Sequence, residues 1–423
     1  MVRKLDYQLK RDKRSRRNRP DQSLKPGVTV TASAGQGSPA GPQLIRAMNE
    51  QLLLDHIRSA GKLSRAELAR LSGLSKPTVS LALANLERAG VVRASGVRTG
   101  TPGPNAVLYE VRPEAGYVLA LDVGSEYVRG AICDFAGTVR VRDTIRTRAK
   151  ARRGRIAEIV RLAERLCAEL NLGIADITQT VLGSPGVYDR RRDALFLSGA
   201  LEGWDHPHLL RDLRSAFGDT LMIENDVDAA ALAEQAHGHG RDVQAFAFVS
   251  IGTGIGMGLV LDGRLRRGAN GAAGEIAYLP LETQSADRDD VRRRGGLEAA
   301  GSAAGIVHAA KRAGLRRAAS AREVFEAAER GDPRAQGVVA GEAALVARAV
   351  LSIIAVVDPE LIVLGGGIGK AAGLVEAVRA ELADRSPIPV DLRVSALGAD
   401  SVVDGCLASG LDSAWATLTG AGR

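Results

Sequence analysis

Hydrophobic residues recur at helical spacing once the chain has passed a stretch of small and polar residues. Residues 26–42 mix Ser, Thr, Ala and Gly with Pro, a composition typical of a flexible linker. The first amphipathic pattern follows this stretch, with apolar residues four or five positions apart. It predicts a helix that begins after Pro42, ends near Gly61 and buries Leu44, Met48, Leu52 and Ile57.

Two further helical segments follow, with a tight turn between them. Ser64 and Glu67 have the spacing of a capping box, which predicts that a helix starts at this serine. Gly73 can adopt the positive φ that a tight turn between helices requires. Ser75 is then placed to cap a second helix, and Pro77 is tolerated in the first turn of that helix.

The second of these helices has one apolar face and one exposed face. Val79, Leu83 and Leu86 recur at spacings of four and three residues, so they face a core. Residues 91–93 and 107–111 resemble two short strands, and the Gly- and Pro-rich residues between them predict a wing. A helix-turn-helix places the N-terminal end of its second helix against base edges in the major groove of DNA. The predicted DNA-contacting residues are therefore Lys76, Pro77, Thr78, Ser80, Leu81, Arg93 and Arg98.

An alternative use of such a helix-turn-helix unit is protein interaction, and its basic side chains can also be merely solvated.

Past residue 112 the pattern changes to apolar strands and helical stretches separated by many glycines, which is typical of an α/β domain. A chain of 423 residues exceeds a single hydrophobic core. We therefore expect a tail and linker (1–42), a winged helix-turn-helix (43–112) and an α/β domain (113–423).

Composition narrows the class of protein. An apolar content of 45% suits a globular protein, and 3% aromatic residues argues against a single-strand binder that stacks bases. No uninterrupted run of about 18 apolar residues predicts a membrane span, and the N-terminus lacks the apolar core of a signal peptide. We therefore expect the cytoplasm. The cysteines Cys133, Cys167 and Cys406 have neither metal-ligand spacing nor a disulfide framework.

Charge is distributed unevenly along the chain. Residues 1–25 hold ten Lys and Arg against three Asp, and so carry +7 of the formal net charge of +8. Such a tail is typically solvated, and it can also add affinity for phosphates without reading sequence. The basic character of the protein therefore belongs to this tail, and sequence preference must come from the helix-turn-helix.

Several short motifs occur in order along the α/β domain. Glycine lets backbone N–H groups approach a phosphate, so the turn after Asp122 can accept one, although this motif is weak by itself. The motifs lie at residues 122–125, 183–186, 224–234, 250–258, 268–278, 295–298 and 358–367.

This ordered series, with the helix-turn-helix before it, resembles the ROK family (repressors, open reading frames and kinases). The resemblance covers about residues 44–410. It implies a two-lobed, actin-like fold of the sugar-kinase type, in which sugar and nucleotide meet in the cleft between the lobes. Members are sugar kinases or sugar-responsive regulators, and those with an N-terminal winged helix-turn-helix are similar to regulators. We expect a homodimer or homotetramer.

The resemblance also implies a sugar pocket. Asn225 and Asp226 match the pair that grips sugar hydroxyls, and in the kinases this Asp is the general base. Glu275 matches the Glu of the Ala-Gly-Glu motif, Glu298 matches the Glu that follows the zinc segment, and Gly186 ends the Gly-x-Pro-Gly loop beside the sugar. Carboxylate and amide groups suit the hydroxyls of a polyol. A helix cap is the alternative role for Asn225 and Asp226, and a structural hydrogen bond is the alternative for Glu275.

Three residues and one segment depart from the family pattern. Tyr278 stands where the family has a His that binds sugar and zinc, and residues 282–297 lack the Cys and His of its zinc loop, so we expect no metal. Tyr278 is predicted as a ligand contact, with packing as the alternative. Glu126 replaces a Thr in the first phosphate turn, where a carboxylate repels ATP by about 4 kcal/mol per charge pair at ~4 Å. Asp228 replaces an Asn and adds a carboxylate near the pocket.

The sequence thus predicts a DNA-binding regulator of carbohydrate genes, with repression as the expected sign. Its expected partners are double-stranded operator DNA and a sugar or sugar-derivative effector, with no membrane and no cofactor. Phosphotransfer is expected to be lost, and the glycine turns at residues 252–258 and 365–367 to be remnants that no longer bind nucleotide. The alternatives are an ATP-dependent sugar kinase that also binds DNA, and a ligand-independent regulator whose α/β domain only oligomerises.

Overall fold

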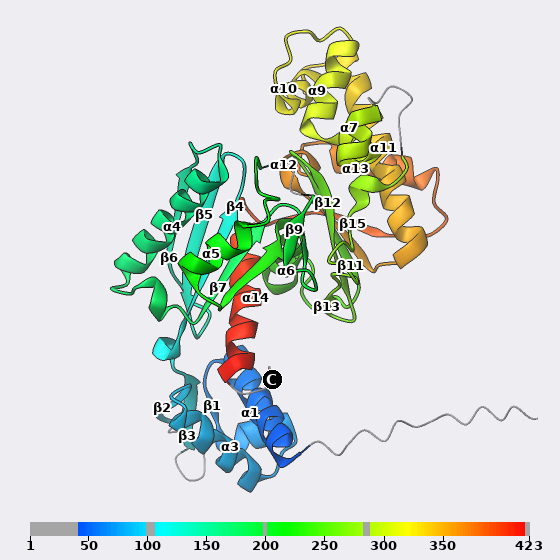
Figure 1. The fold of residues 1–423 in the computed structure, drawn as a ribbon. Helices are drawn as coiled ribbons and strands as arrows, with labels where there is room; N and C mark the ends of the chain where they lie inside the picture. The colour runs from blue at the N-terminus through cyan, green and yellow to red at the C-terminus, as the bar shows by residue number, and fades with distance from the viewer. Residues whose placement is uncertain (1–40, 99–105, 198–200, 282–287, 419–423) are drawn as a thin grey trace, which may run out of the picture. The chain divides into compact units, whose positions relative to one another are not determined.

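The computed structural model describes residues 41–98, 106–197, 201–281 and 288–418. Its N-terminal part is a winged helix-turn-helix, as predicted (Figure 1). The small sheet of this part has the strand order β1-β3-β2 and is antiparallel throughout. The elements are α1 (Pro42–Ala60), β1 (Leu63–Ser64), α2 (Arg65–Ser72), α3 (Lys76–Arg88), β2 (Val92–Arg98) and β3 (Ala106–Val111).

Local chemistry defines the ends of α2 and α3 as the sequence predicts. The Ser64 side chain accepts from the Glu67 backbone N–H, and the Glu67 side chain accepts from the Ser64 backbone N–H, which completes the capping box. Gly73 ends α2 with φ 70°, in the left-handed region. Ser75 caps α3 by accepting from the Thr78 backbone N–H at 3.3 Å. These contacts fix the angle between α2 and α3 within a few residues of chain.

Two sequence expectations for this part need correction. The buried face of α1 is formed by Leu53, Leu54 and Ile57, whereas Met48 and Leu52 are exposed and the Leu44 side chain lies outside the described residues. Strand β2 also runs on to Arg98, where the sequence predicts a wing from residue 94. A bulge in the register between Ala94 and Val97, with Gly96 at φ 116°, lets the strand continue past the irregular residue.

The α/β part begins with a five-stranded sheet of order β10-β7-β4-β5-β6 (Figure 1). Strands β4, β5 and β6 form an antiparallel meander, while β7 and β10 add to β4 in parallel. The elements in chain order are η1 (Pro113–Ala115), β4 (Tyr117–Val123), β5 (Tyr127–Asp134), β6 (Val139–Arg146), α4 (Arg152–Glu169), η2 (Ile174–Asp176), β7 (Gln179–Ser184), β8 (Val187–Asp189), β9 (Ala194–Phe196), α5 (Leu209–Phe217), β10 (Leu221–Asn225) and α6 (Asp226–His237).

Both faces of this sheet are covered, and the alternation along β4 shows how. Leu119 and Leu121 belong to the core beneath α4, whereas Val118 and Ala120 belong to the core shared with the C-terminal helix α14 (Ser401–Leu418). Side chains alternate between the two faces of a strand, so a continuous apolar run predicts burial on both sides.

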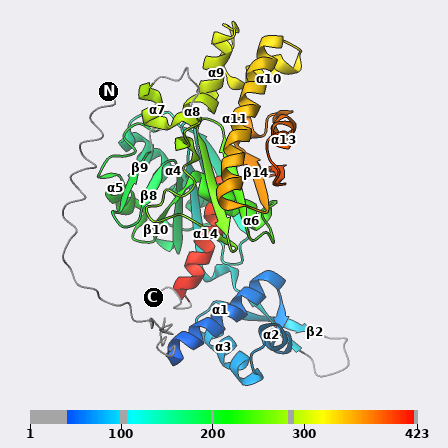
Figure 2. The same cartoon turned by 90° about the vertical axis from the view of Figure 1, so that its right-hand side faces the viewer.

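A second five-stranded sheet has the order β13-β12-β11-β14-β15, with β14 parallel to β11 and to β15. Its main core holds Val249 and Ile251 from β11 against α11, which packs with α10 and α13 (Figure 2). The elements are β11 (Phe246–Ile251), β12 (Ile255–Leu261), β13 (Arg264–Leu265), η3 (Ile276–Tyr278), α7 (Arg288–Arg294), α8 (Gly296–Gly301), α9 (Ala303–Arg312), α10 (Ala321–Glu329), α11 (Pro333–Val357), β14 (Leu361–Gly365), α12 (Gly366–Gly369), α13 (Leu374–Ala383) and β15 (Asp391–Val394).

Helices α6 and α14 pack against each other and connect the two sheets. Gly405 of α14 lies so close to α6 that a Cβ there would come within 1.7 Å of the Ala229 carbonyl oxygen. Helix α6 also packs on β11 and β12 of the second sheet. The two-lobed arrangement agrees with the fold predicted from the sequence, and the first residue of α6, Asp226, lies at the meeting point of the lobes.

Helix α11 bears on the expectation that no segment of the chain spans a membrane. By length and composition it could cross a membrane, although its charged residues interrupt the apolar run that the sequence search required. Half of that apolar stretch is buried inside the protein, and Val346, Val350 and Ile353 lie in the core of the second lobe. Its hydrophobicity is therefore the hydrophobicity of a core helix.

Candidate functional site

Asn225 connects the end of β10 to the start of α6. Its Oδ1 accepts from the backbone N–H groups of Val227 at 2.9 Å and Asp228 at 3.0 Å, which caps the helix. Its Nδ2 donates to the Gly186 carbonyl oxygen at 3.0 Å, so the structure brings these two predicted site residues together. The helix-cap role is therefore real. An amide nitrogen carries two N–H donors, and no partner for the second one is found among the described residues.

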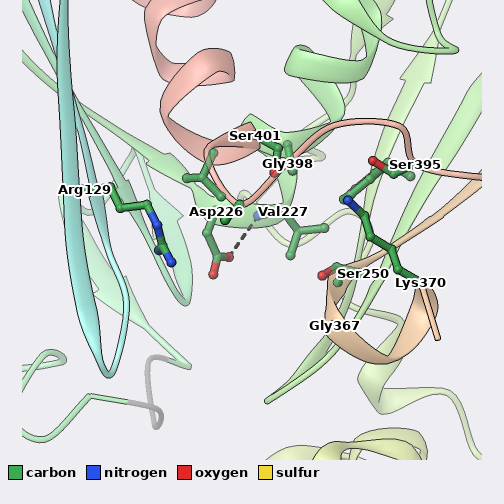
Figure 3. Close-up of a pocket in the computed structure, with 14 residues that line it drawn as sticks. Arg129, Asp226, Val227, Ser250, Gly367, Lys370, Ser395, Gly398 and Ser401 are labelled. Atoms are coloured by element: carbon green, nitrogen blue, oxygen red, sulfur yellow. Dashed lines mark hydrogen bonds between the residues drawn. The ribbon is translucent and has the colours of Figure 1, made fainter. Parts of the chain in front are cut away.

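Asp226 lines a cavity of about 420 Å³ between the lobes. In Figure 3 the side chains of Arg129 and Asp226 point toward each other, and Lys370 and Ser395 lie on the opposite side of the cavity from Arg129. Asp226 Oδ1 accepts from the Val227 backbone N–H at 2.9 Å, and burial raises the pKa of this carboxyl.

Glu275 and Glu298 do not line this cavity, but both lie close enough to Asp226 to interact with it electrostatically. Burial, followed by repulsion from Asp226 and Glu298, raises the pKa of Glu275 to about 7. Burial also raises the pKa of Glu298, whose Oε2 accepts from the Ile255 backbone N–H at 2.9 Å. A Cβ on Gly254 would meet the same oxygen at 2.9 Å, so the glycine loop at residues 250–258 leaves room for Glu298.

Asp228 adds a further carboxyl to this acidic cluster. It is 4% exposed, and burial, then repulsion from Glu224, raises its pKa to about 8. Crowded carboxyls hold protons near neutral pH because each buried charge disfavours the next. A protonated carboxyl both donates and accepts hydrogen bonds, so Asp228 and Glu275 can match the hydroxyls of a polyol in either direction, and Asp226 and Glu298 add acceptor oxygens.

Arg267 is a residue of this site that sequence reasoning missed. Its guanidinium makes a forked contact with Glu224, with Nε 2.9 Å from Oε1 and Nη2 against Oε2. Glu224 is 2% exposed and immediately precedes Asn225. The ion pair therefore neutralises a buried charge next to the acidic cluster and holds the end of β10 in place. The only sequence signal was a basic residue directly before the glycine-rich stretch at residues 268–278.

A second missed arginine lies on β5, just after the first phosphate turn. Asp122 and Arg129 face each other across β4 and β5, with Arg129 Nη1 3.1 Å from Asp122 Oδ2. Burial, then the charge of Asp226, raises the pKa of Asp122 to about 7 in spite of Arg129. Glu126, the departure singled out in the sequence, is exposed at the tip of this hairpin.

Tyr278 lies near the acidic cluster but directs its hydroxyl elsewhere. The side chain is 42% exposed, and its hydroxyl donates to the Arg293 carbonyl oxygen at 3.1 Å. Burial, followed by the charges of Glu275 and Glu298, raises the pKa of Tyr278. Ligand contact by Tyr278 stays a prediction. Among the described residues no group of three His, Cys, Asp or Glu side chains could hold a metal ion, and residues 282–287 lie outside them.

The predicted DNA-contacting residues of α3 form one surface. Lys76, Pro77, Ser80 and Leu81 are exposed, and Leu81 keeps 56% of its surface accessible although it is apolar. Thr78 is half-buried, and its hydroxyl lies 2.8 Å from the Ser75 hydroxyl. This surface is available to base edges at the N-terminal end of the helix, where a recognition helix makes its contacts.

The two predicted wing arginines are held by ion pairs. Arg93 Nε lies 2.8 Å from Glu110 on the neighbouring strand, and Arg98 Nη1 lies 2.6 Å from Glu67 of the capping box. Hydrogen bonding from the Ser64 backbone, followed by Arg98, lowers the pKa of Glu67 to about 2. The Arg98 contact ties the wing to the start of α2, while residues 99–105 of the wing lie outside the described residues.

Two family models match this chain. The ROK family model matches residues 118–407, and a winged helix-turn-helix DNA-binding model matches residues 49–93. A crystal structure of a ROK family transcriptional regulator, described as a homologue of the E. coli MLC protein, superposes with a TM-score of 0.73 at 21% identity. The superposition covers 89% of this chain and 98% of the solved chain, and it supports the same overall fold.

Curated relatives include both repressors and kinases. A putative xylose repressor from Caldicellulosiruptor sp. is 26% identical over 243 residues, which is 56% of this chain and 60% of the repressor. The chain thus matches less than two thirds of that repressor's length. An N-acetylmannosamine kinase from Salmonella heidelberg is 30% identical over 279 residues, which is 66% of this chain and 92% of the kinase.

Proposed function

This chain belongs to the ROK family, and we propose that it is a sugar-responsive transcriptional regulator, with repression as its sign. The observation that carries the proposal is the combination of two surfaces in one chain. One is the exposed N-terminal end of α3 in a winged helix-turn-helix, and the other is the acidic cluster around Asp226 between two lobes. The first is suited to binding DNA, and the second is suited to sensing a small polar molecule.

The input is a sugar or sugar derivative. The second N–H of Asn225 and a Glu275 carboxyl that titrates near pH 7 offer hydrogen-bond donors to adjacent hydroxyls, and the carboxyl oxygens of Asp226, Glu275 and Glu298 offer acceptors. The names of the relatives, a xylose repressor and an N-acetylmannosamine kinase, support this ligand class. Lobe closure on the sugar then changes the geometry of the DNA-binding units, because the ligand binds one lobe arrangement better than the other.

The output is binding to double-stranded operator DNA in the cytoplasm by a homodimer or homotetramer. Lys76, Pro77, Thr78, Ser80 and Leu81 of α3 read the major groove. In the free protein, ion pairs with carboxylates hold the side chains of Arg93 and Arg98 in place. When DNA binds, each arginine exchanges its carboxylate partner for a phosphate of the DNA backbone. Paired units bind two half-sites related by the symmetry of the protein.

Phosphotransfer is lost in this proposal. Asp122 is engaged by Arg129, and Glu126 adds a negative charge to the turn that would face ATP phosphates. The rival function is a kinase that also binds DNA, with Asp226 as its general base. A coupled assay of ADP release with xylose, glucose and N-acetylmannosamine decides between them. Turnover above the background of Asp226→Asn supports the rival, and the same rate in both supports the regulator.

Selection from a random DNA library provides the operator, and fluorescence anisotropy then measures its affinity with and without each sugar of that panel and its phosphate. We expect a preferred sequence that at least one sugar weakens or strengthens by about tenfold, which is a typical coupling strength. Ser80→Ala and Leu81→Ala should lose sequence preference, with Glu87→Ala on the exposed distal part of α3 as the matched control. No preferred sequence would contradict the DNA-binding claim.

A further inference from the structure

The second lobe contains a cavity of about 490 Å³ that is separate from the cleft between the lobes. Its size falls in the range of small-molecule sites. The cavity lies between α9 and α11, and α8 contributes the remaining wall. Its lining is mostly small and apolar, and includes Ala299, Ala300, Gly305, Ile306, Gly341 and Leu345.

Two exposed glycines of α11 form one side of this cavity. Gly337 and Gly341 are one helical turn apart and so lie on the same face of the helix. A Cβ at either position would meet no atom within 4 Å, so no packing contact explains the absence of a side chain. Two glycines inside a long helix cost stability relative to alanine, and the absence of side chains at both positions leaves this side of the cavity open.

Glu342 lines the cavity and is the one lining carboxyl. It is 4% exposed, and its Oε1 has no hydrogen-bond partner in the described part of the chain. Burial alone raises the pKa of Glu342 to about 8, so the carboxyl holds its proton at neutral pH. Buried polar atoms are normally satisfied, so the Glu342 carboxyl beside the cavity can take a hydrogen-bond partner from a ligand.

Two arginines and a histidine lie at the cavity mouth. His308 and Arg312 come from α9, and Arg334 comes from the first turn of α11. Arg334 is paired with Asp332 at 2.8 Å, whereas no ion pair is found for Arg312 among the described residues. A protonated Glu342 adds no negative charge, so the field in the cavity favours an anion and opposes an amine.

We propose that this cavity binds a small organic anion, with its carboxylate or phosphate at Arg312 and Arg334, its apolar body on the glycine floor, and an acceptor atom at Glu342. Arginine presents planar donors that match both carboxylate and phosphate. The neutral Glu342 carboxyl donates its proton to the ligand's acceptor atom, which satisfies the group that the empty cavity leaves unpaired.

Helix α8 links this cavity to the acidic cluster. Ala299 and Ala300 form part of the cavity wall, while the preceding residue, Glu298, contacts the Ile255 backbone N–H beside the interlobe site. A ligand that shifts α8 therefore shifts Glu298, and sugar and anion affect each other's affinity by the same factor. This regulatory consequence rests on the proposed sugar-sensing function, whereas anion binding itself does not.

Isothermal titration of the full chain, without DNA or sugar, tests the binding claim. The probes are phenyl phosphate and 4-hydroxybenzoate, with benzyl alcohol and benzylamine as neutral and cationic matches. We expect saturable binding of at least one anion at about millimolar or better affinity, and at least tenfold weaker binding of the alcohol and amine.

Four variants locate the site. Gly341→Leu fills the cavity and Arg312→Gln removes its unpaired charge, and each should weaken anion binding at least tenfold. Ala340→Leu and Arg316→Gln are the matched controls, since both residues are exposed and neither lines the cavity. Unchanged affinity in Gly341→Leu, preference for benzylamine, or no saturable anion binding overturns the proposal. So does a change in oligomeric state of Gly341→Leu without anion binding, which assigns the face to a second copy of the chain.

A separate titration then measures sugar affinity with the anion at saturation. A shifted sugar affinity that Gly341→Leu abolishes supports the link through α8. Anion binding with an unchanged sugar affinity rejects the link but keeps the site, and anion binding with no sugar binding contradicts the proposed sugar sensing alone.

Discussion

Replacing Arg267 with methionine should destabilise the protein far more than replacing its neighbour Arg266. Arg267 makes a forked contact with Glu224, whose side chain is 2% exposed, and Glu224 lies beside Asp226 and Asp228. Removing one partner of a buried ion pair leaves an uncompensated charge, which costs about 3–5 kcal/mol. Arg266 pairs with Asp262 where both side chains are exposed, so its loss should cost under about 1 kcal/mol.

Urea unfolding followed by the fluorescence of Trp204 and Trp415 measures this difference. Both tryptophans are fully buried, and Trp204 belongs to the core that also contains Ile223, next to Glu224. The double variant Glu224→Gln with Arg267→Met should recover most of the loss, because a neutral pair leaves no buried charge. Equal losses for Arg266→Met and Arg267→Met, or a loss below about 1 kcal/mol for the latter, would refute the reasoning.

The remaining predictions concern pH, capping and the tail. The pKa of Asp228 is raised from 3.8 to about 8 and that of Glu275 from 4.5 to about 7, so the folded state holds more protons than the unfolded chain between pH 5 and 8. The free energy of unfolding should therefore fall as pH rises through 7 to 8, and a rise across that window in thermal melts would be inconsistent with these burials. Ser64→Ala should destabilise α2 by about 1 kcal/mol by amide hydrogen exchange, whereas Ser59→Ala, which caps no helix, should have little effect. Deleting residues 1–25 should reduce the salt dependence of DNA binding while sparing sequence preference, and lost preference would assign specificity to the tail.

The helix-turn-helix was predictable because its determinants are local. Ser64, Glu67, Gly73 and Ser75 act within three or four residues of chain, and each cap and turn forms as the sequence predicts. The buried face of α1 was not predictable in the same way. Its periodicity allowed more than one apolar face, and contacts with distant segments select the face with Leu53 and Leu54.

In the candidate site, too, local roles could be predicted from the sequence and long-range partners could not. Asn225 follows a strand and precedes a helix, so its capping role could be foreseen, and the ordered motifs indicated that Glu275 and Glu298 would meet Asp226. The partners of the buried charges could not be foreseen. Arg267 reaches Glu224 across 43 residues of sequence, and no spacing rule connects a loop arginine to a strand end at that distance.

The structure also bears on the alternative roles considered for the site residues. Asn225 caps α6 and has one further N–H donor, so the capping role is compatible with the predicted sugar contact. Tyr278 donates its hydroxyl to the Arg293 backbone, so contact with a ligand requires this hydrogen bond to be exchanged. Arg93 and Arg98 are held by carboxylates, so their DNA contacts require exchange of partners.

The most direct test of sugar-responsive DNA binding is operator affinity measured with and without sugar in Glu275→Gln, compared with the unchanged protein. Glutamine keeps the size of the side chain but cannot ionise, so the fold should survive, and Glu202→Gln on an exposed loop is the control. The account predicts that a sugar shifts operator affinity about tenfold in the unchanged protein and in Glu202→Gln, and that Glu275→Gln loses most of the shift while binding operator normally. An equal sugar response in all three proteins would contradict it, and so would operator binding that no sugar alters.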